Sequence, residues 1–358
     1  MIARAAYVPD YDVVLDGRRL PADLRSTITA VRFDEALEGA SRVELQFANV
    51  GLRLLDRPGF DLDVPLELSL GYRPQGLEPV FTGSITGVDP TFPSGGMPTL
   101  TLNAQDATSR LTKSRKDRAF PHYLTDGAIA ALVAAENGLV PRSDLVAAGV
   151  GGVGAFAEQP RYQYKQSDHQ LLRQIAAEYG YEIWGDGPFL NIRFLTPGLP
   201  APDIELHWGR SLVDFTPRLT SIGQVAAVRA HIWVEALKTQ IGVEVTWDGE
   251  RLAVRVLPAV FAEQDDTIEA TLTIPDVPVD SAPDAIKWLI GEMRRRVNGR
   301  LTASGSAVGD PRFRAGRVIA VTGLGDRFSG RNYRLTSVAH TLDQGGYRTR
   351  FQVRKEVV

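Results

Sequence analysis

The chain of 358 residues is 44% hydrophobic and mixes 40 basic with 43 acidic residues, for a formal net charge of −3. This length predicts two or three domains with cores of their own, and the balanced charge argues against nucleic acid as the main partner. The absence of cysteine excludes disulfides, thiol catalysis and cysteine-ligated zinc. We expect no transmembrane helix, because no apolar run reaches about 18 residues. We also expect no signal peptide, because residues 1–7 lack a basic start followed by an apolar stretch.

Residues 1–112 predict a series of short β-strands. Tyr11–Leu15 alternates apolar and polar residues and ends in Asp16-Gly17, a dipeptide typical of hairpin turns. Another strand carries its leucines on one face and is expected to stop at Gly71. Many short strands at this spacing indicate a barrel or a sandwich. The remaining strands are expected at Ile28–Phe33, Arg42–Phe47, Val64–Leu70, Phe81–Ile85 and Thr99–Leu102.

The composition changes after these strands. Residues 109–118 are rich in charge, and we interpret them as a solvated linker, although their basic residues could contact an acidic partner. A helix is predicted over Asp126–Asn137, with Thr125 or Asp126 as its N-cap and Gly138 as its stop. A second, shorter helix is expected near Ser143.

A glycine-rich loop over residues 148–160 contains the spacing of a dinucleotide-binding fingerprint at Gly149, Gly151 and Gly154. That fingerprint binds a pyrophosphate only between a strand and a helix. Here the glycines follow a helical segment and precede Pro160 and an extended run. We therefore interpret them as a loop, not a nucleotide site.

The clearest local pattern extends from Tyr162 to Trp184. A short strand leads into Ser167, and Gln170 three residues later completes a capping box that predicts a helix start. Gly180 stands where that helix should end. The helix is expected to present one apolar face, made of Leu171, Leu172, Ile175, Ala176 and Tyr179. A hairpin then follows, with strands Tyr181–Trp184 and Phe189–Phe194 around the turn Gly185-Asp186-Gly187.

Residues 208–358 predict strands again, interrupted by one more helix. Ser281 and Asp284 form a second capping box, with Pro283 in the first turn. The apolar face of this helix is Ile286, Leu289, Ile290 and Met293, and Asn298-Gly299 ends it. Arg294, Arg295 and Arg296 lie in its last turn, where positive charge suits the helix dipole, although an acidic partner is possible. Strands are expected over Val225–Val234, Ile241–Trp247, Leu252–Val256 and, with turns, Phe313–Val353.

Two regions of the chain resemble each other. Val64–Tyr72, Phe81–Val88 and Leu100–Ala104 form an alternating strand ending near glycine, a strand carrying threonine before valine, and a final alternating strand. The same order recurs near the C-terminus, in residues 316–325, Phe328–Val338 and Tyr347–Val353. This repeat predicts two similar β-barrels on either side of the central helix and hairpin.

No arrangement of residues in the sequence points to catalysis. The histidines are dispersed without metal-ligand spacing, and the tryptophans are expected to fill cores. Asp265-Asp266 is uninformative, because 43 acidic residues guarantee carboxylate pairs. We therefore expect no catalytic residue, no cofactor, no metal and no enzyme. The histidines are His122, His169, His207, His231 and His340, and the tryptophans are Trp184, Trp208, Trp233, Trp247 and Trp288.

Two segments carry a family resemblance. The run YKQSDHQLLRQIAAEYGYEIW, residues 164–184, looks like the segment shared by phage late control gene D proteins, baseplate hub proteins of contractile tails, and the type VI secretion spike protein VgrG. Residues 309–353 resemble the end of the late control gene D hubs. The matching positions are Ser167, Asp168, Leu171, Gly180, Gly316, Phe328, Gly330, Tyr333, His340, Gly346, Tyr347 and Thr349.

The resemblance implies a mechanical role. Hubs of this family form a homotrimer in which each subunit contributes two tube-like barrels, so that six similar barrels match a hexameric tail tube protein while the trimer seats a trimeric spike protein. Because the chain ends at Val358 without a spike domain, the spike is expected to be a separate chain. Other baseplate components are expected partners, whereas nucleic acid recognition and membrane insertion are not expected. The resemblance thus implies assembly in the bacterial cytoplasm, into a virion baseplate, a tailocin or another contractile injection system.

The expected fold class is α+β and rich in β-structure, with two similar tube-like β-barrel domains and an inserted α+β domain. The domains are expected at residues 1–112, 113–207 and 208–358, the last with a helical insertion near 281–298. Residues 208–235 could instead return to the first barrel. Two other functions stay open: the distal tail hub of a noncontractile phage, and a cell-wall or polysaccharide hydrolase with β-modules.

Overall fold

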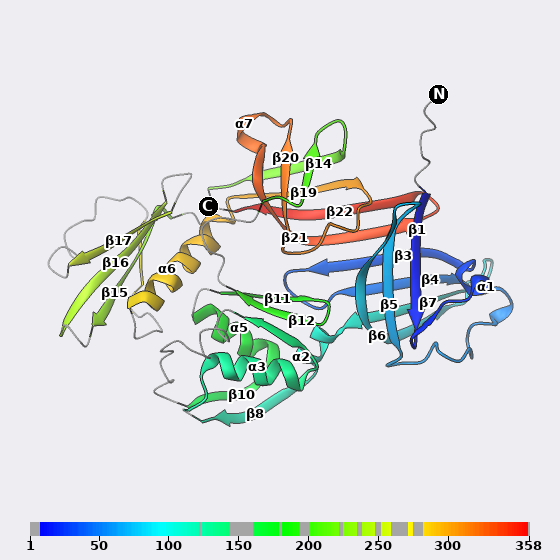
Figure 1. The fold of residues 1–358 in the computed structure, drawn as a ribbon, viewed down its shortest axis with the longest axis horizontal. Coiled ribbons are helices and arrows are strands. Elements are labelled where there is room, and N and C mark those ends of the chain that lie inside the picture. The colour runs from blue at the N-terminus through cyan, green and yellow to red at the C-terminus, as the bar shows by residue number, and fades with distance from the viewer. Residues whose placement is uncertain are drawn as a thin grey trace.

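A computed structural model of the chain describes residues 8–121, 123–143, 160–178, 181–193, 201–221, 225–234, 238–247, 252–258, 271–274 and 282–356. One long sheet runs through the molecule, and two smaller units that contain helices lie beside it (Figure 1). The second helix expected near Ser143, the glycine-rich loop, and the stop at Gly180 lie outside the described residues.

The long sheet has thirteen strands, eleven of them in the order β14-β19-β22-β21-β3-β4-β7-β6-β5-β1-β2, with β20 and β13 beside β21. Its first half comes from the N-terminal region and its second half from the C-terminal region. The first-half elements are β1 (Val8–Leu15), β2 (Arg18–Arg19), α1 (Ala22–Arg25), β3 (Ile28–Ala36), β4 (Arg42–Ala48), the 3-10 helix η1 (Val50–Leu52), β5 (Pro65–Arg73), β6 (Gly76–Thr91) and β7 (Thr99–Asp106). The second-half elements are β13 (Ile204–His207), β14 (Leu212–Leu219), β19 (Leu301–Val308), β20 (Val318–Thr322), α7 (Gly325–Phe328), β21 (Gly330–Asp343) and β22 (Gly346–Lys355).

The strand predictions for the N-terminal region are confirmed, with one error. Asp16 and Gly17 both have positive φ, 50° and 72°, as a tight hairpin turn requires. The predicted stop at Gly71 is wrong, because β5 runs on to Arg73. Gly71 instead allows β6 to approach, since a Cβ there would lie 2.3 Å from the carbonyl oxygen of Gly76.

The predicted internal repeat is present in the strand pairing. The order β3-β4-β7-β6-β5 in the first half matches β14-β19-β22-β21-β20 in the second. Thr86 of β6 is an extra residue in the pairing with β7, and Thr336 of β21 is an extra residue in the pairing with β22. A second bulge lies at Thr29 of β3 and at Val213 of β14. Because bulges fix the register, they align the two halves residue by residue.

A backbone turn of unusual conformation also recurs. Asp63 and Gly316 have positive φ, 64° and 88°. Each donates its N–H at 2.8 Å to the carbonyl oxygen of the residue before the bulge, Ile85 in the first half and Leu335 in the second. The positive φ of this turn favours the glycine at position 316, and aspartate adopts it in the first half.

The two halves are joined edge to edge, because β21 pairs antiparallel with β3 over seven residues, Ser337–Asp343. Each half nevertheless has a hydrophobic core of its own, one containing Phe47 and Leu68 and the other Tyr333 and Phe351. The closed barrel that we predict for each half stays a prediction.

The first smaller unit, called the central module below, follows β7. Its elements are η2 (Ala107–Ser109), α2 (Arg110–Lys113), β8 (Arg115–Phe120), α3 (Asp126–Glu136), β9 (Val140–Ser143), β10 (Arg161–Ser167), α5 (Asp168–Glu178), β11 (Glu182–Asp186) and β12 (Phe189–Arg193). Strand β8 pairs with β10, so the linker predicted over residues 109–118 is wrong.

The predicted helix starts in this module are confirmed. Thr125 Oγ1 accepts the Ala128 N–H of α3 at 3.2 Å. The Gln170 N–H donates to Ser167 Oγ at 3.2 Å, and the Ser167 N–H donates to Gln170 Oε1 at 2.9 Å, which is the reciprocal capping box. The apolar face of α5 packs on α3 in a buried core that includes Leu171, Leu172, Ile175, Ile129 and Val133.

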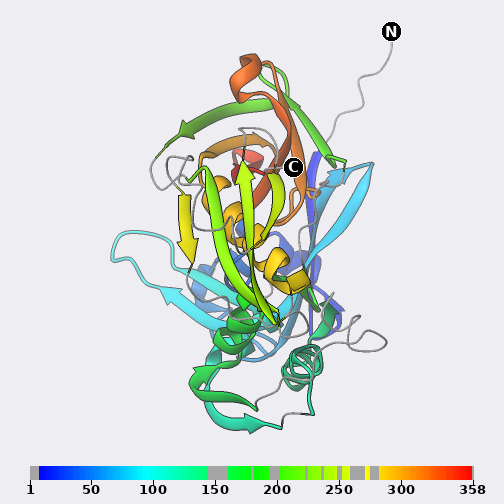
Figure 2. The ribbon, with the colours of Figure 1, turned by 90° about the vertical axis from the view of Figure 1, so that its left-hand side faces the viewer.

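The second smaller unit, called the side unit, is inserted between β14 and β19. A sheet in the order β17-β16-β15-β18 is covered on one face by helix α6, as Figure 2 shows. The elements are β15 (Ala227–Val234), β16 (Thr239–Trp247), β17 (Leu252–Pro258), β18 (Thr271–Ile274) and α6 (Ala282–Val297). Leu289 and Met293 of the predicted apolar face are buried. Of the basic triplet, Arg294 is buried, whereas Arg295 and Arg296 pair with Glu292.

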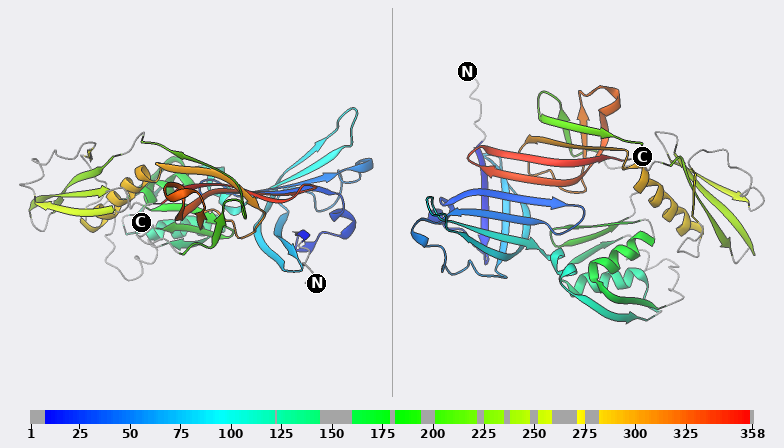
Figure 3. Two further views of the ribbon diagram at one scale, coloured as in Figure 1. Left: turned by 90° about the horizontal axis from the view of Figure 1, so that it is seen from above. Right: turned by 180° about the vertical axis from the view of Figure 1, so that it is seen from behind.

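Seen from above, the long sheet twists along its length (Figure 3). The two hairpins β6–β7 and β21–β22 turn at the end of the molecule that lies away from the side unit. The two smaller units therefore leave that end of the sheet uncovered.

We expect Leu171→Asp to unfold the central module, because Leu171 is 1% exposed and a buried unpaired carboxylate is strongly destabilising. Limited proteolysis should then cleave the variant within residues 107–193 at a temperature at which the wild-type module resists cleavage. Arg173→Asp on the exposed face of α5 is the control and should leave the module resistant. Equal resistance of the two variants would contradict this packing.

Candidate interaction surface

The joint between the two halves contains a buried histidine. His340 of β21 is 1% exposed and stacks on Phe33 of β3, with ring centroids 5.7 Å apart. Its Nε2 lies 3.0 Å from the carbonyl oxygen of Phe313, and its Nδ1 lies 2.9 Å from the hydroxyl of Tyr347. Because a carbonyl oxygen only accepts, Nε2 carries the proton and Nδ1 accepts from Tyr347. Burial lowers the pKa of His340 to about 4, so the ring is neutral at pH 7.

Tyr347, one of the positions that carry the family resemblance, completes this joint. Its ring lies 5.7 Å from the ring of Tyr72 in the first half, and Tyr72 donates its hydroxyl to the Gly309 carbonyl at 2.8 Å. A Cβ at Gly309 would lie 2.1 Å from the Tyr347 ring, so only glycine fits there. Burial raises the pKa of Tyr347, which keeps its hydroxyl protonated as a donor.

Of the residues that carry the family resemblance, Phe328 and Tyr333 pack in the core of the second half. Tyr333 is fully buried and donates its hydroxyl to the Phe328 carbonyl at 2.6 Å. Burial raises the pKa of Tyr333 to about 12. Gly330 begins β21 and pairs with Val321. These contacts are structural.

Asp168 organises the central module. Its Oδ2 accepts from Lys116 Nζ at 2.7 Å and from Asn137 Nδ2 at 2.9 Å. Its Oδ1 accepts from Arg118 Nη2 at 3.1 Å and from Gln163 Nε2 at 3.0 Å. Burial alone would raise the pKa of Asp168, but these donors lower it below its ordinary value. The charges of the supposed linker are thus the partners of a buried carboxylate.

A cluster of charges connects the central module to the second half. Glu182 of β11 binds both Arg334 of β21 and Arg354 of β22. Burial would raise the pKa of Glu182, but the two guanidinium groups lower it. Arg334 also lies over the ring of Trp184, 5.1 Å from its centroid, and Gly316 packs against the same indole. These contacts hold the hairpin of the module against the sheet.

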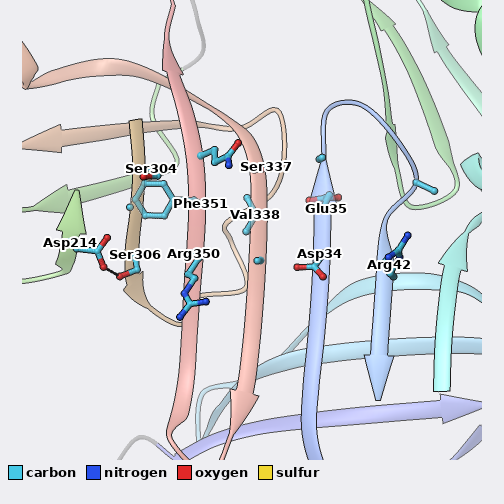
Figure 4. A pocket seen from close by; sticks show the side chains of 15 residues that line it. Asp34, Glu35, Arg42, Asp214, Ser304, Ser306, Ser337, Val338, Arg350 and Phe351 are labelled. Atoms are coloured by element: carbon cyan, nitrogen blue, oxygen red, sulfur yellow. Dashed lines mark hydrogen bonds between the residues drawn. The ribbon is translucent and has the colours of Figure 1, made fainter. Parts of the chain in front are cut away.

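One face of the long sheet is polar where the two halves meet. The side chains around this hollow come from six adjacent strands, with Asp34 between Arg42 and Arg350 (Figure 4). Ser306 donates its hydroxyl to Asp214. Serine side chains, together with side chains of both charges, make this face hydrophilic without a strong excess of either sign of charge. Other residues that line the hollow are Ser304, Ser337, Phe351 and Gln352.

Among the described strands with an open backbone edge, β6 and β14 correspond by the repeat to β21 and β3, which pair with each other. Strand β6 pairs with β5 only as far as Ser84, so its Thr86–Thr91 segment pairs on one side alone, with β7. Strand β14 pairs with β19, and beyond the bridge at Leu212 its other edge has no described partner. Val213 and Leu219 of β14 are exposed. Open edges with exposed apolar residues are surfaces that a further strand can join.

In the described part of the chain, no group of three or more His, Asp or Glu side chains is placed to hold a metal ion. Nor does any described helix have the length and hydropathy needed to cross a membrane. His207 and Trp208 lie together at the end of β13, whereas His169 lies on α5 and His231 on β15. Sequence reasoning missed the roles of Lys116, Arg118 and Glu182, because only their partners far along the chain reveal them.

A family model described as the Alg8 N-terminal domain matches residues 58–344. A search of curated proteins gives no match. Among solved structures, the prophage MuSo2 43 kDa tail protein from Shewanella oneidensis covers 96% of this chain and 98% of its own length, with TM-score 0.66 and 15% identity. The tail protein from Neisseria meningitidis MC58 covers 98% and 97%, with TM-score 0.61 and 14% identity.

A third solved structure is the Escherichia coli c3393 protein, described as a component of the type VI secretion system with structural similarity to the bacteriophage T4 tail proteins gp27 and gp5. It covers 95% of this chain and 76% of its own length, with TM-score 0.58 and 12% identity. At these identities the similarity concerns the fold. The chain therefore has the fold of solved phage tail proteins along almost its whole length.

We expect the free energy of unfolding to fall as the pH decreases from about 6.5 to about 4, because the unfolded chain protonates His340 and the folded chain does not. The loss from this residue should reach roughly 3 kcal/mol. In His340→Gln, which can still donate to Phe313, this part of the pH dependence should vanish.

Denaturant titrations at several pH values measure this difference. The exposed His207→Gln is the matched control and should keep the wild-type slope. Burial also lowers the pKa of His169, so the difference between variants is the readout. Identical slopes in His340→Gln and the wild type would contradict the neutral buried ring.

Asp168→Asn should destabilise the central module by about 3 kcal/mol, because it leaves Lys116 and Arg118 beside a neutral group. Glu136→Gln is the control, since Glu136 pairs with the same two cations but is far more exposed. It should cost less than about 1 kcal/mol. Thermal unfolding followed by proteolysis of the module distinguishes the two, and equal losses would show that burial of Asp168 is unimportant.

Proposed function

The chain belongs to the family described as the Alg8 N-terminal domain, and from its fold we propose that it is a structural baseplate hub of a contractile, phage-tail-like injection particle. The observation that carries this proposal is the internal repeat. Its two halves join through β21 and β3, whereas the corresponding edges of β6 and β14 stay open. A chain with two like units and two complementary open edges can form a closed ring with further copies.

The register of the internal joint predicts the register between copies. Alignment of the bulges makes β6 equivalent to β21 and β14 equivalent to β3. The open edge of β6 should therefore pair antiparallel with β14 of the next copy, as β21 pairs with β3 within the chain. We call this proposed contact between copies the seam.

The side chains that this register brings together suit one another. Val88 would face Leu219, which is exposed in the single chain, and Asp89 would face Arg218. Thr91 would face Thr216. Apolar, oppositely charged and threonine pairs are the cross-strand pairs that stabilise antiparallel sheets.

Three copies joined in this way would give a homotrimer with six similar units in a ring. Such a ring matches a hexameric tail tube protein by its approximate sixfold symmetry and a trimeric spike protein by its true threefold symmetry. The polar sheet face around Asp34 and Arg350 would line the ring, and the central module and side unit would contact other baseplate components. We propose the predicted domain division 1–112, 113–207 and 208–358 with adjusted boundaries, so that η2 and α2 fall in the central module and β13 falls in the second half.

The proposed role is mechanical, and it needs no catalytic group. The similarity to tail proteins supports a part in a tail-like particle, and the resemblance of residues 164–184 and 309–353 to late control gene D hubs favours the hub. A noncontractile tail hub remains the second candidate, because it would share this fold. Electron microscopy of the native particle separates the two by the presence of a contractile sheath.

The charge pair across the seam provides a test. Asp89→Arg or Arg218→Asp should weaken association of copies by about fivefold per seam, and the double variant should restore it, because the pair is then reversed. Native mass spectrometry over a concentration series measures the trimer, with Lys113→Glu on the exposed module surface as the control. A chain that stays monomeric even with its tube and spike proteins present would refute the proposed function.

A further inference from the structure

We infer that the seam lacks its central hydrogen bonds, so that copies of the chain pair with each other more weakly than the two halves pair within the chain. The inference rests on the proposed function, because it concerns the same ring. It follows from the register of the internal joint and from the residues at the equivalent positions.

The backbone bonds of the internal joint can be assigned. The Leu37 N–H donates to the Thr336 carbonyl at 2.9 Å. In an antiparallel ladder, hydrogen-bonded pairs recur at every second residue. His340 and Phe33, which are direct partners two such steps along, therefore form a hydrogen-bonded pair that exchanges two N–H···O=C bonds.

The equivalent residues in the seam are both proline. Strand alignment makes Pro90 of β6 equivalent to His340 and Pro217 of β14 equivalent to Phe33. Proline has no N–H. Where the internal joint makes two backbone bonds, the seam can make none, and two carbonyl groups face each other across it.

The prolines stand where the single chain can tolerate them. Their nitrogens point toward the open edges, by analogy with His340 and Phe33, so neither removes a bond to β7 or β19. Proline on an edge strand also hinders pairing with unrelated strands. Before assembly, Pro90 and Pro217 would thus hinder unwanted pairing at both edges. During assembly, they would lower the affinity of one copy for the next.

The open edges of β6 and β14 therefore fit a second copy of the chain, but the contact is weak and needs another component to keep the copies together. The seam keeps its side-chain pairs, Val88 with Leu219 and Asp89 with Arg218, and its backbone pair at Val88 and Leu219. We infer that ring closure depends on a partner that binds several copies at once and so raises their effective concentration. This makes assembly conditional on that partner.

The test is the double variant Pro90→Ala, Pro217→Ala in the full chain. Restoring two backbone bonds should lower the dissociation constant of the copies by on the order of tenfold per seam. Each single variant, which restores one bond, should give an intermediate shift. Pro93→Ala in the β6–β7 turn, outside the ladder, is the matched control and should leave association unchanged.

Sedimentation velocity over a concentration series measures association, and circular dichroism verifies that each variant is folded. Hydrogen exchange should show protection of the new amides at positions 90 and 217 in the associated state. A wild-type chain that forms the ring alone as tightly as the double variant would overturn the inference and leave the ring itself standing. Unprotected amides in a ring of the double variant would also overturn it, because they would show a different register. Failure of all variants to form a ring with tube and spike present would instead refute the proposed function.

Discussion

The pairing of β21 with β3 is the interaction on which the rest of the structure depends. It joins the seven strands of the first half and the six strands of the second half into one sheet, and it buries His340 between Phe33 and Tyr347. A neutral histidine suits this place because it donates from one nitrogen and accepts at the other, satisfying two polar groups in an apolar joint. The joint sets the position of the second half, and through Glu182 and Arg334 the central module is held against that half.

Repetition within one chain also explains the asymmetry of its edges. Within the chain, β21 and β3 can form all of their backbone hydrogen bonds without a risk of wrong pairing, because the two halves are covalently linked. In the proposed ring, a full ladder between copies would let them pair before the other components bind, and exposed edges that pair freely lead to aggregation. The two prolines occupy a pair of positions where both edges lose a donor without loss of a hydrogen bond to the strands behind them.

Charged residues in this protein serve mainly to position its parts. Asp168 holds β8, α3 and β10 together, and Glu182 holds the module on the sheet. Asp168 is buried and Glu182 is half-buried, and each pairs with two cations, which lower its pKa and keep it ionised. Ion pairs of this kind tolerate little rearrangement, which suits the mechanical role that we propose.

The sequence by itself determined the local features: the capping box at Ser167 and Gln170, the hairpin turn at Asp16-Gly17, and the repeat of strand patterns. These depend on neighbours a few residues apart, so their physics is visible in the sequence. Only the tertiary structure decided that residues 110–113 form helix α2 and residues 115–120 form strand β8. Lys116 and Arg118 of β8 bind Asp168, which lies some fifty residues further along the chain. The tertiary structure alone decided the β21–β3 pairing as well, because strand alternation defines a face but does not say which distant edge a strand joins.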